Sequence, residues 1–131
     1  MTTKSQRPRV LLVDDYPDAR EMYSEYLQFS GFDVVEAANG IEALEHALEA
    51  APDIILMDLS LPVMDGWEAT RRLKSDNRTA GIPVVFMTAR AQTRELDHFK
   101  SLGAAGVIVK PFDPMTLAAS LRNQMQPANA G

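Results

Sequence analysis

Residues that could hold a metal ion and a phosphoryl group directly follow four short apolar segments of the chain. Asp14 and Asp15 follow VLLV, Asp58 follows IILM, Thr88 follows VVFM, and Lys110 follows VIV. Carboxylates suit Mg²⁺, while an ammonium and a hydroxyl suit phosphoryl oxygens. If the four segments are parallel strands, all five side chains meet at one edge of one sheet. The pattern therefore predicts magnesium-dependent phosphoryl chemistry on an aspartate.

The segments that carry these residues have the composition of buried parallel strands. They are apolar throughout instead of alternating, which is typical of strands buried on both faces of a sheet. The expected strands span residues 10–13, 54–57, 84–87 and 107–109, and the more mixed residues 33–37 form an expected edge strand. Helix-period segments alternate with these strands, so the sequence predicts a parallel sheet covered by helices on both faces.

Apolar spacing and local stop signals indicate five helices. The first spans roughly Pro17 to Ser30 and stops at Gly31, which readily adopts a left-handed conformation. The second ends at Pro52, and the third is capped by Asp65. The fourth is marked by Leu96 and Phe99 and ends before Gly103, and the fifth is capped by Asp113 with Pro114 in its first turn. Five such strand–helix units predict an α/β fold. We expect a flavodoxin-like, doubly wound, five-stranded parallel sheet of order 2-1-3-4-5 with five helices.

In that strand order, the first and third strands flank the point at which ligands bind. Asp14, Asp15 and Asp58 lie at the carboxyl ends of these two strands, so three negative charges crowd together. Without a cation such a cluster repels itself. Mg²⁺ is the expected cofactor, because it is commonly bound by one or two carboxylates, several waters and a phosphate oxygen. Mn²⁺ is the alternative ion.

Length and composition limit the class of protein. The 131 residues fit one domain, with a flexible segment expected at residues 1–8, the domain at 9–125 and a tail at 126–131. The chain has no cysteine, no apolar signal segment and no run of membrane-spanning length, so we expect a cytoplasmic protein with no membrane contact. A net charge of −5 without a basic stripe predicts no direct contact with nucleic acid, because duplex affinity depends on neutralising phosphates.

The ordered set of motifs resembles that of response-regulator receiver domains of two-component signalling, as in single-domain chemotaxis regulators. The motifs are VLLVDD, ILMD, MTA and VKPF, with NGIEALE before the second expected helix and LPVMDGWE after the third expected strand. The resemblance extends from about Arg9 to Met125. It implies a phosphorylation-activated switch whose partners are a histidine kinase or a histidine phosphotransfer protein and a downstream target protein. The switch would act as a monomer or as a phosphorylation-dependent dimer.

The resemblance also implies a role for each metal-site residue. Asp15 and Asp58 would bind Mg²⁺ directly, and the backbone carbonyl of Ser60 would complete the protein ligands. Asp14 would hold the ion through water while facing Lys110. Taken singly, Asp14 or Asp15 could equally cap the next helix, and it is the pair that favours a metal.

Asp58 is the implied phosphoacceptor and acts as the nucleophile toward a phosphohistidine. Lys110 would neutralise phosphoryl oxygens, and Thr88 would donate its hydroxyl to the phosphoryl group and draw its loop inward. Taken singly, Thr88 could merely end its strand and Lys110 could be a surface lysine. The Lys110–Pro111 bond is expected to be cis and to aim the lysine, and a trans turn is the alternative.

Three positions are expected to tune the switch. Val107 stands where many receiver domains have Tyr or Phe, three residues before the lysine, so the output surface is expected to respond weakly there or to lie elsewhere. Ser60 and Arg90, two residues after Asp58 and Thr88 respectively, are placed to gate attacking water. Arg90→Ala is expected to change the lifetime of the phosphoryl group more than its rate of formation.

Enzymatic functions are disfavoured, apart from magnesium-dependent self-phosphorylation from a phosphodonor and self-dephosphorylation. A haloacid-dehalogenase-type phosphatase needs a second acid two residues after the nucleophile, where this chain has Ser60. A flavin binder needs a phosphate loop where this chain has two carboxylates, and no GxxxxGK[ST] loop of a nucleotide hydrolase occurs. The remaining alternative is a pseudo-receiver, an interaction module that does not cycle phosphate. The expected output is protein binding, unless the chain is a piece of a longer protein.

Overall fold

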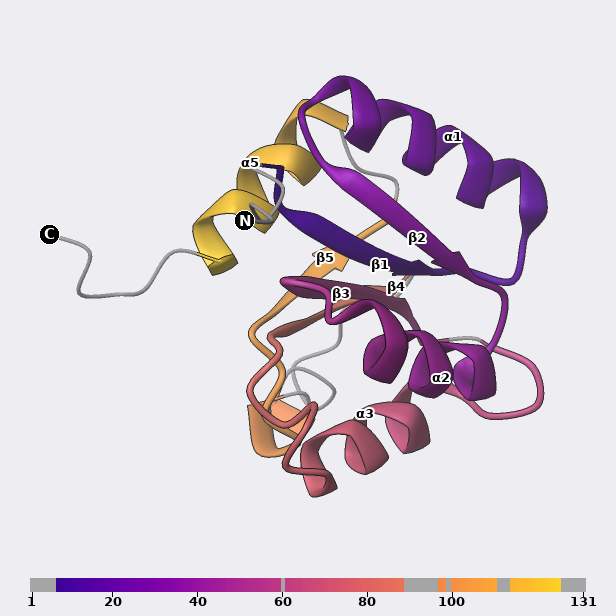
Figure 1. Ribbon diagram of the computed structural model, residues 1–131, viewed down its shortest axis with the longest axis vertical. Coiled ribbons are helices and arrows are strands. Elements are labelled where there is room, and N and C mark those ends of the chain that lie inside the picture. The colour runs from indigo at the N-terminus through magenta and orange to yellow at the C-terminus, as the bar shows by residue number, and fades with distance from the viewer. Residues whose placement is uncertain (1–6, 60, 89–96, 99, 111–113, 126–131) are drawn as a thin grey trace, which may run out of the picture.

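The five expected strands form one parallel sheet. The computed structural model describes residues 7–59, 61–88, 97–98, 100–110 and 114–125. The strands are β1 (Arg9–Val13), β2 (Asp33–Ala37), β3 (Ile54–Asp58), β4 (Val84–Thr88) and β5 (Gly106–Val109). Their order is β2-β1-β3-β4-β5 and each neighbouring pair is parallel (Figure 1). The predicted fold class and strand order are confirmed.

Four helices are described around this sheet. They are α1 (Pro17–Phe29), α2 (Gly40–Ala50), α3 (Gly66–Ser75) and α5 (Pro114–Met125). The segment predicted to form the fourth helix lies partly outside the described residues, and the part that is described is helical at residues 97–98 and 100–101. The predicted Asp113 cap lies outside the described residues as well. In the described part of the chain, no helix is long and apolar enough to cross a bilayer.

Local signals begin and end the helices as the sequence predicts. Asp65 is the N-cap of α3, and its side chain accepts a hydrogen bond from the backbone N–H of Glu68 at 2.9 Å. The chain turns after α1 at Gly31, whose φ of 103° costs glycine little. After α2, Ala51 adopts a left-handed conformation directly before Pro52. These predicted helix boundaries are confirmed.

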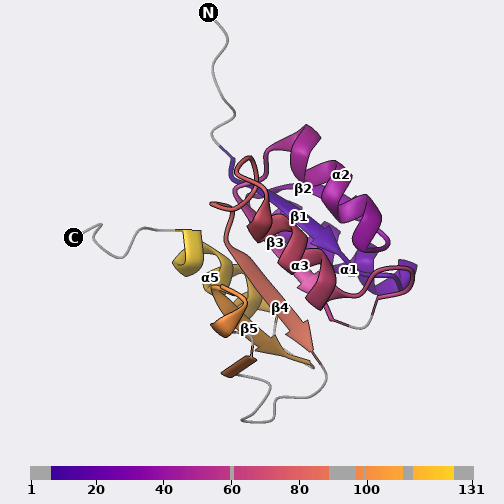
Figure 2. The ribbon, with the colours of Figure 1, turned by 90° about the horizontal axis from the view of Figure 1, so that it is seen from below.

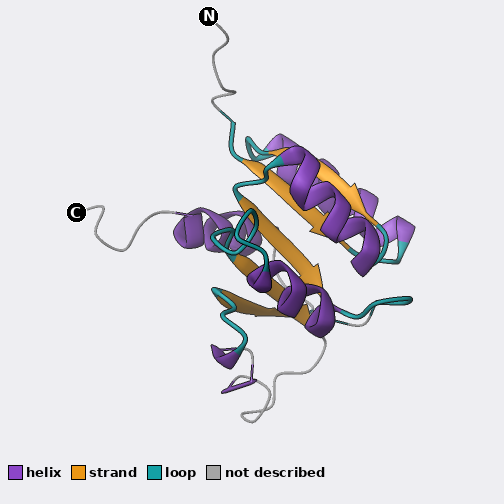
Figure 3. Ribbon diagram, turned by 60° about the horizontal axis from the view of Figure 1, so that its bottom comes forward, coloured by secondary structure: helices purple, strands orange, loops and turns teal. Residues whose placement is uncertain are grey.

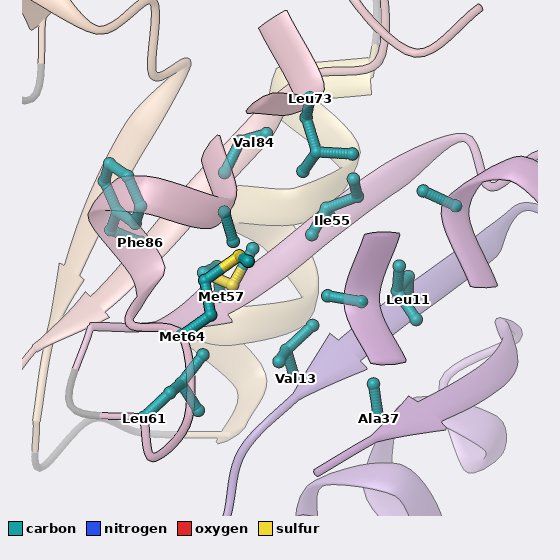
Figure 4. Close-up of a cluster of buried hydrophobic side chains, with 13 residues drawn as sticks. Leu11, Val13, Ala37, Ile55, Met57, Leu61, Met64, Leu73, Val84 and Phe86 are labelled. Atoms are coloured by element: carbon teal, nitrogen blue, oxygen red, sulfur yellow. The ribbon is translucent and has the colours of Figure 1, made fainter. Parts of the chain in front are cut away.

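Two hydrophobic clusters cover the two faces of the sheet. Because side chains alternate along a strand, Leu11 and Val13 belong to one cluster, and Val10 and Leu12 belong to the other. The first, here called the α2/α3 cluster, also includes residues of α2, of α3 and of the loop after β3 (Figure 4). The second, the α1/α5 cluster, includes residues of α1 and α5. Figures 2 and 3 show the sheet between these helical layers.

Candidate functional site

Strand register brings the two acidic segments together. β1 and β3 are paired up to Val13 and Met57. The residues that come next, Asp14 and Asp58, are therefore at the same level of adjacent parallel strands. A five-stranded sheet of this order places ligands at this edge, between β1 and β3, where the winding direction reverses.

Lys110 reaches the same edge from the far side of the sheet. β5 is paired with β4 up to Val109 and Thr88, and the backbone N–H of Lys110 donates to the carbonyl of Thr88 at 2.7 Å. This bond sets where Lys110 leaves the sheet. Its ammonium donates a hydrogen bond to Oδ2 of Asp58 at 3.0 Å and lies 3.6 Å from Oδ2 of Asp14. One lysine thus contacts two carboxylates from two strands.

Asp14, Asp15 and Asp58 form a cluster that can hold a metal ion. One carboxylate oxygen from each lies within 4.8 Å of the corresponding oxygens of the other two. Asp14 is 1% exposed and Asp58 is 7% exposed, whereas Asp15 faces solvent. Oδ2 of Asp14 is buried and accepts no hydrogen bond. Buried polar atoms normally have partners, and a carboxylate oxygen in this position suits a hard cation, so the residues fit Mg²⁺.

The ionisable groups at the site perturb one another. Burial raises the pKa of Asp14 above its ordinary value of 3.8, and the charges of Asp58 and Asp15 raise it further, against the opposing effects of the Tyr16 backbone N–H and Lys110. Partial burial acts to lower the pKa of Lys110, but its hydrogen bond to Asp58 and the two carboxylate charges outweigh burial and raise the pKa. Lys110 is therefore protonated at neutral pH, and its positive charge faces two of the three carboxyl groups of the cluster.

The backbone at Asp14 is held on both of its polar groups. Its N–H donates to the carbonyl of Ala37 in β2 at 3.1 Å, and its carbonyl accepts a hydrogen bond from Nη1 of Arg20 in α1 at 2.8 Å. Its side-chain Oδ1 accepts from the backbone N–H of Tyr16 at 2.9 Å. The end of β1 is thus tied to β2, to α1 and to its own following loop.

The loop after β3, which follows Asp58, packs closely against two glycines. A Cβ on Gly66 would lie 2.7 Å from the carbonyl oxygen of Asp58, and a Cβ on Gly40 would lie 2.3 Å from the carbonyl oxygen of Met64. Distances below 3.0 Å are too short for real Cβ contacts. Both positions therefore require glycine if the loop is to keep this conformation.

The other predicted site residues are placed only in part. Thr88 ends β4, next to the strand that carries Asp58, and is 8% exposed. Val107 lies in β5 and packs against the α2/α3 cluster. Ser60, Arg90 and Pro111 lie outside the described residues, as does the predicted cis bond.

Trp67 packs against β4 and against the segment that follows β4. Its ring centroid lies 5.5 Å from that of Phe86 in β4 and 4.4 Å from that of His98. Trp67 lies at the start of α3 and is the single tryptophan of the chain, which suits it as a fluorescence reporter. The aromatic contacts support such a use, because one ring touches both the sheet and the helical residues after it.

Sequence reasoning did not single out Arg20, Glu36 or Gly40, which support the backbone around the site. An arginine in the first turns of α1 and a glutamate near the end of the expected edge strand were visible signals. Nothing in the sequence indicated that they would pair. The Gly40 contact left no local signal at all, because it depends on how closely the loop after β3 approaches α2.

Comparison with known proteins finds a family model that matches most of this chain. The family model of the response regulator receiver domain matches residues 10–122. The chain is 38% identical over 115 residues to the DNA-binding dual master transcriptional regulator RpaA of Synechocystis sp., and the match covers 88% of this chain and 48% of RpaA. The chain spans about half the length of the curated relatives it matches.

Solved structures with the same fold support this match. The chemotaxis response regulator CheY4 of Vibrio cholerae is 35% identical with a TM-score of 0.86, over 91% of this chain and 99% of that one. The receiver domain of the sensor histidine kinase PA1611 from Pseudomonas aeruginosa is 30% identical with a TM-score of 0.83, over 91% of this chain and 98% of that one. The PA1611 structure has a magnesium ion coordinated in its active-site cleft.

The relatives contradict one prediction about partners. The net charge of the sequence predicted no direct contact with nucleic acid, whereas several relatives are named as DNA-binding regulators. The expectation came from the net charge of 131 residues, and those relatives are about twice as long as this chain. The charge of one part of a protein does not decide what another part binds, so the prediction of no nucleic-acid partner is wrong.

Proposed function

Since the chain belongs to the family of response regulator receiver domains of two-component systems, we propose that it is a switch controlled by phosphorylation of Asp58. The donor is a phosphohistidine on a histidine kinase or on a histidine phosphotransfer protein. The observation that carries this proposal is the position of Lys110, whose ammonium contacts the carboxylates of both Asp58 and Asp14 at the ligand-binding edge of the sheet. A positive charge there can stabilise a phosphoryl group on Asp58.

In the proposed metal site, the carboxylates of Asp15 and Asp58 and the backbone carbonyl of Ser60 are direct ligands, and Asp14 holds the ion through water. The mutual distances of the three carboxylates, and the buried oxygen of Asp14 that accepts no hydrogen bond, support the assignment of the three aspartates. When bound, Mg²⁺ would neutralise part of the charge of the cluster and of the incoming phosphoryl group. Asp15 is exposed, so it offers a side chain that an ion can reach from solvent.

In the proposed transfer, the carboxylate of Asp58 is the nucleophile. One of its oxygens forms a bond to phosphorus while the bond from phosphorus to the donor imidazole nitrogen breaks, and that nitrogen keeps the electron pair. The transition state of such a transfer spreads charge over the equatorial oxygens, so the protein must mainly position the groups and neutralise charge. Lys110, protonated because its pKa is raised, supplies one fixed positive charge beside Asp58.

Thr88 is the proposed sensor of the phosphorylated state. It ends β4 beside the strand that carries Asp58, and its hydroxyl would donate to a phosphoryl oxygen. A phosphoryl group adds roughly −1.5 to −2 charges, which shifts a two-state equilibrium toward the conformation that pairs them. Trp67, in contact with β4 through Phe86, would report that shift by its fluorescence.

The output of the switch is proposed to be a change in its contacts with a partner. Several relatives are named as DNA-binding regulators, which supports control of DNA binding as one such output. Val107 replaces the aromatic residue expected in β5, which supports a weak response along that strand.

Incubation with acetyl phosphate and Mg²⁺, followed by intact mass measurement, tests the proposed function. The wild-type protein is expected to gain the mass of one phosphoryl group, and chelation of the metal is expected to prevent the gain. Asp58→Asn should abolish it. Asp76→Asn is the matched control, because Asp76 lies in the turn after α3 and pairs with Arg78 instead of Lys110.

A protein that gains no phosphoryl group under these conditions, or that gains one equally well in the Asp58→Asn variant, would contradict the proposal. The first result would favour the pseudo-receiver alternative, in which the fold serves as an interaction module. Circular dichroism of each variant shows whether a loss of phosphorylation reflects a loss of fold.

A further inference from the structure

Glu36 is a charged residue on the sheet face that packs against α1. It is the fourth residue of β2, and residues two apart on a strand share a face. Val34, two residues earlier, packs in the α1/α5 cluster together with Tyr23 and Tyr26 of α1. Glu36 therefore points to the side of the sheet covered by α1, where a partner from that helix can pair with its partly exposed carboxylate.

Arg20 of α1 is that partner, and it makes two contacts with one guanidinium group. Its Nε donates to Oε1 of Glu36 at 3.0 Å, and its Nη1 donates to the backbone carbonyl of Asp14 at 2.8 Å. The side chain of Arg20 is 20% exposed, so most of it is packed against the protein. α1 and β2 lie side by side in Figure 1, which is what allows one side chain to join them.

The contact with Asp14 completes a set of bonds that all lead to β2. The N–H of Asp14 is bonded to Ala37 of β2, and its carbonyl is bonded through Arg20 to Glu36 of β2. The peptide unit between Asp14 and Asp15 is therefore fixed at the point where two mutually repelling carboxylates must be presented together. Burial already makes the charged form of Asp14 costly there.

We infer that Arg20, held by Glu36, is a positioning residue that fixes the Asp14–Asp15 backbone so that both carboxylates face the metal-binding edge of the sheet. The inference rests on the proposed function, because it assumes that the acidic cluster binds a divalent cation. In the described part of the chain, Arg20 forms no ion pair with a carboxylate of the cluster, so its effect is exerted through the backbone of Asp14.

Positioning and simple electrostatics predict opposite results for the loss of this arginine. Arg20 carries a positive charge close to the cluster, so electrostatics alone predicts that removing it strengthens the binding of Mg²⁺. Loss of positioning predicts weaker binding, because the ligands are then free to separate. The two explanations also differ for Glu36→Gln. Charge alone predicts weaker binding of Mg²⁺. Positioning predicts little change, because a glutamine oxygen still accepts the hydrogen bond from Arg20.

The test is a titration with Mg²⁺ by isothermal calorimetry on the full chain, without any phosphodonor. We expect Arg20→Met to weaken Mg²⁺ binding by roughly tenfold, the lower end of the range for groups that orient metal ligands. Arg20→Lys, which keeps the charge but cannot bridge both partners, should lose part of the affinity, and Glu36→Gln should lose little. Arg71→Met is the matched control, since Arg71 forms an ion pair with Glu68 within α3.

Equal or tighter binding of Mg²⁺ by Arg20→Met, with wild-type binding intact, overturns the inference but leaves the proposed function standing. Absence of Mg²⁺ binding in the wild-type protein overturns both. A fall in thermal stability without a change in Mg²⁺ affinity shows that Arg20 is only structural, which also overturns the inference. If Arg20→Met does not fold, Arg20→Lys and Glu36→Gln decide by the same criteria.

Discussion

The ammonium of Lys110 lies 3.0 Å from Oδ2 of Asp58, although the two residues are 52 positions apart in the chain. The lysine is also 3.6 Å from Oδ2 of Asp14, so it occupies the space next to two of the three carboxylates of the cluster. Lys110 thus places one positive charge beside two carboxylates at this edge of the sheet. Its removal should affect metal binding and phosphoryl transfer in opposite directions.

Lys110→Met is expected to tighten the binding of Mg²⁺, because a competing positive charge leaves Asp58 and Asp14. The same change should slow phosphorylation by acetyl phosphate roughly 100-fold, since a fixed charge that stabilises the transferring group is lost. Calorimetry gives the affinity and time-resolved intact mass gives the rate. Lys100→Met, at an exposed helical position, should change neither. An unaltered phosphorylation rate in Lys110→Met would refute the assigned role.

Asp14→Asn is expected to stabilise the protein in the absence of divalent ions. The pKa of Asp14 is raised in the folded state, so the folded state binds this proton more tightly than the unfolded chain does. The cost of ionising Asp14 in the folded protein is absent below the ordinary pKa of 3.8. The cost grows as the pH rises through the raised pKa of the folded state, and it is complete above that pKa. The variant should therefore melt at a higher temperature than the wild type, and this difference should increase as the pH rises through this range.

Added Mg²⁺ provides the second half of the same test. It should raise the melting temperature of the wild type more than that of Asp14→Asn, because a ligand that binds the folded state more tightly stabilises it more. A variant that melts below the wild type at neutral pH without metal would show that Asp14 stabilises the fold, against this prediction.

Gly40→Ala is expected to destabilise the protein by about 1–3 kcal/mol, the usual cost of forcing an extra carbon into a packed region. The new Cβ would lie 2.3 Å from the carbonyl oxygen of Met64, and a backbone atom cannot move aside as a flexible side chain can. Urea unfolding followed by Trp67 fluorescence measures the change. Gly81→Ala is the matched control, since a Cβ there would have no neighbour within 4 Å. Equal effects of the two substitutions would contradict the packing argument.

Val63→Gly is expected to stabilise the protein. Val63 has a φ of 67° and is 81% exposed, in a turn closed by a 2.6 Å hydrogen bond from the N–H of Met64 to the carbonyl of Pro62. A left-handed conformation costs such a residue about 1–2 kcal/mol, and glycine's extra flexibility in the unfolded chain costs about 0.5–1 kcal/mol. The net gain should be up to about 1.5 kcal/mol in urea unfolding. Val109→Gly, at an exposed strand position, should instead be destabilising.

Most of the fold could be predicted because its signals are local. The apolar runs that became β1, β3, β4 and β5 can be recognised within a few residues, and Asp65 marks the start of α3 without reference to the rest of the chain. Parallel strands share one carboxyl edge, so the prediction that Asp14, Asp58 and Lys110 meet followed once the strands had been placed. The prediction about nucleic acid was wrong for a related reason: net charge describes only the residues that are counted.

The sequence by itself determined which side chains stand at the ends of the strands, because strand and helix periods and caps depend on neighbouring residues. Only the tertiary structure decided what supports those side chains: the pairing of Arg20 with both Glu36 and the Asp14 carbonyl, and the contact of Gly40 with Met64. These contacts join elements whose relative rotation and spacing come from the packing of the whole core. No local pattern encodes them, because each depends on two segments arriving at one place at a separation of a few ångströms.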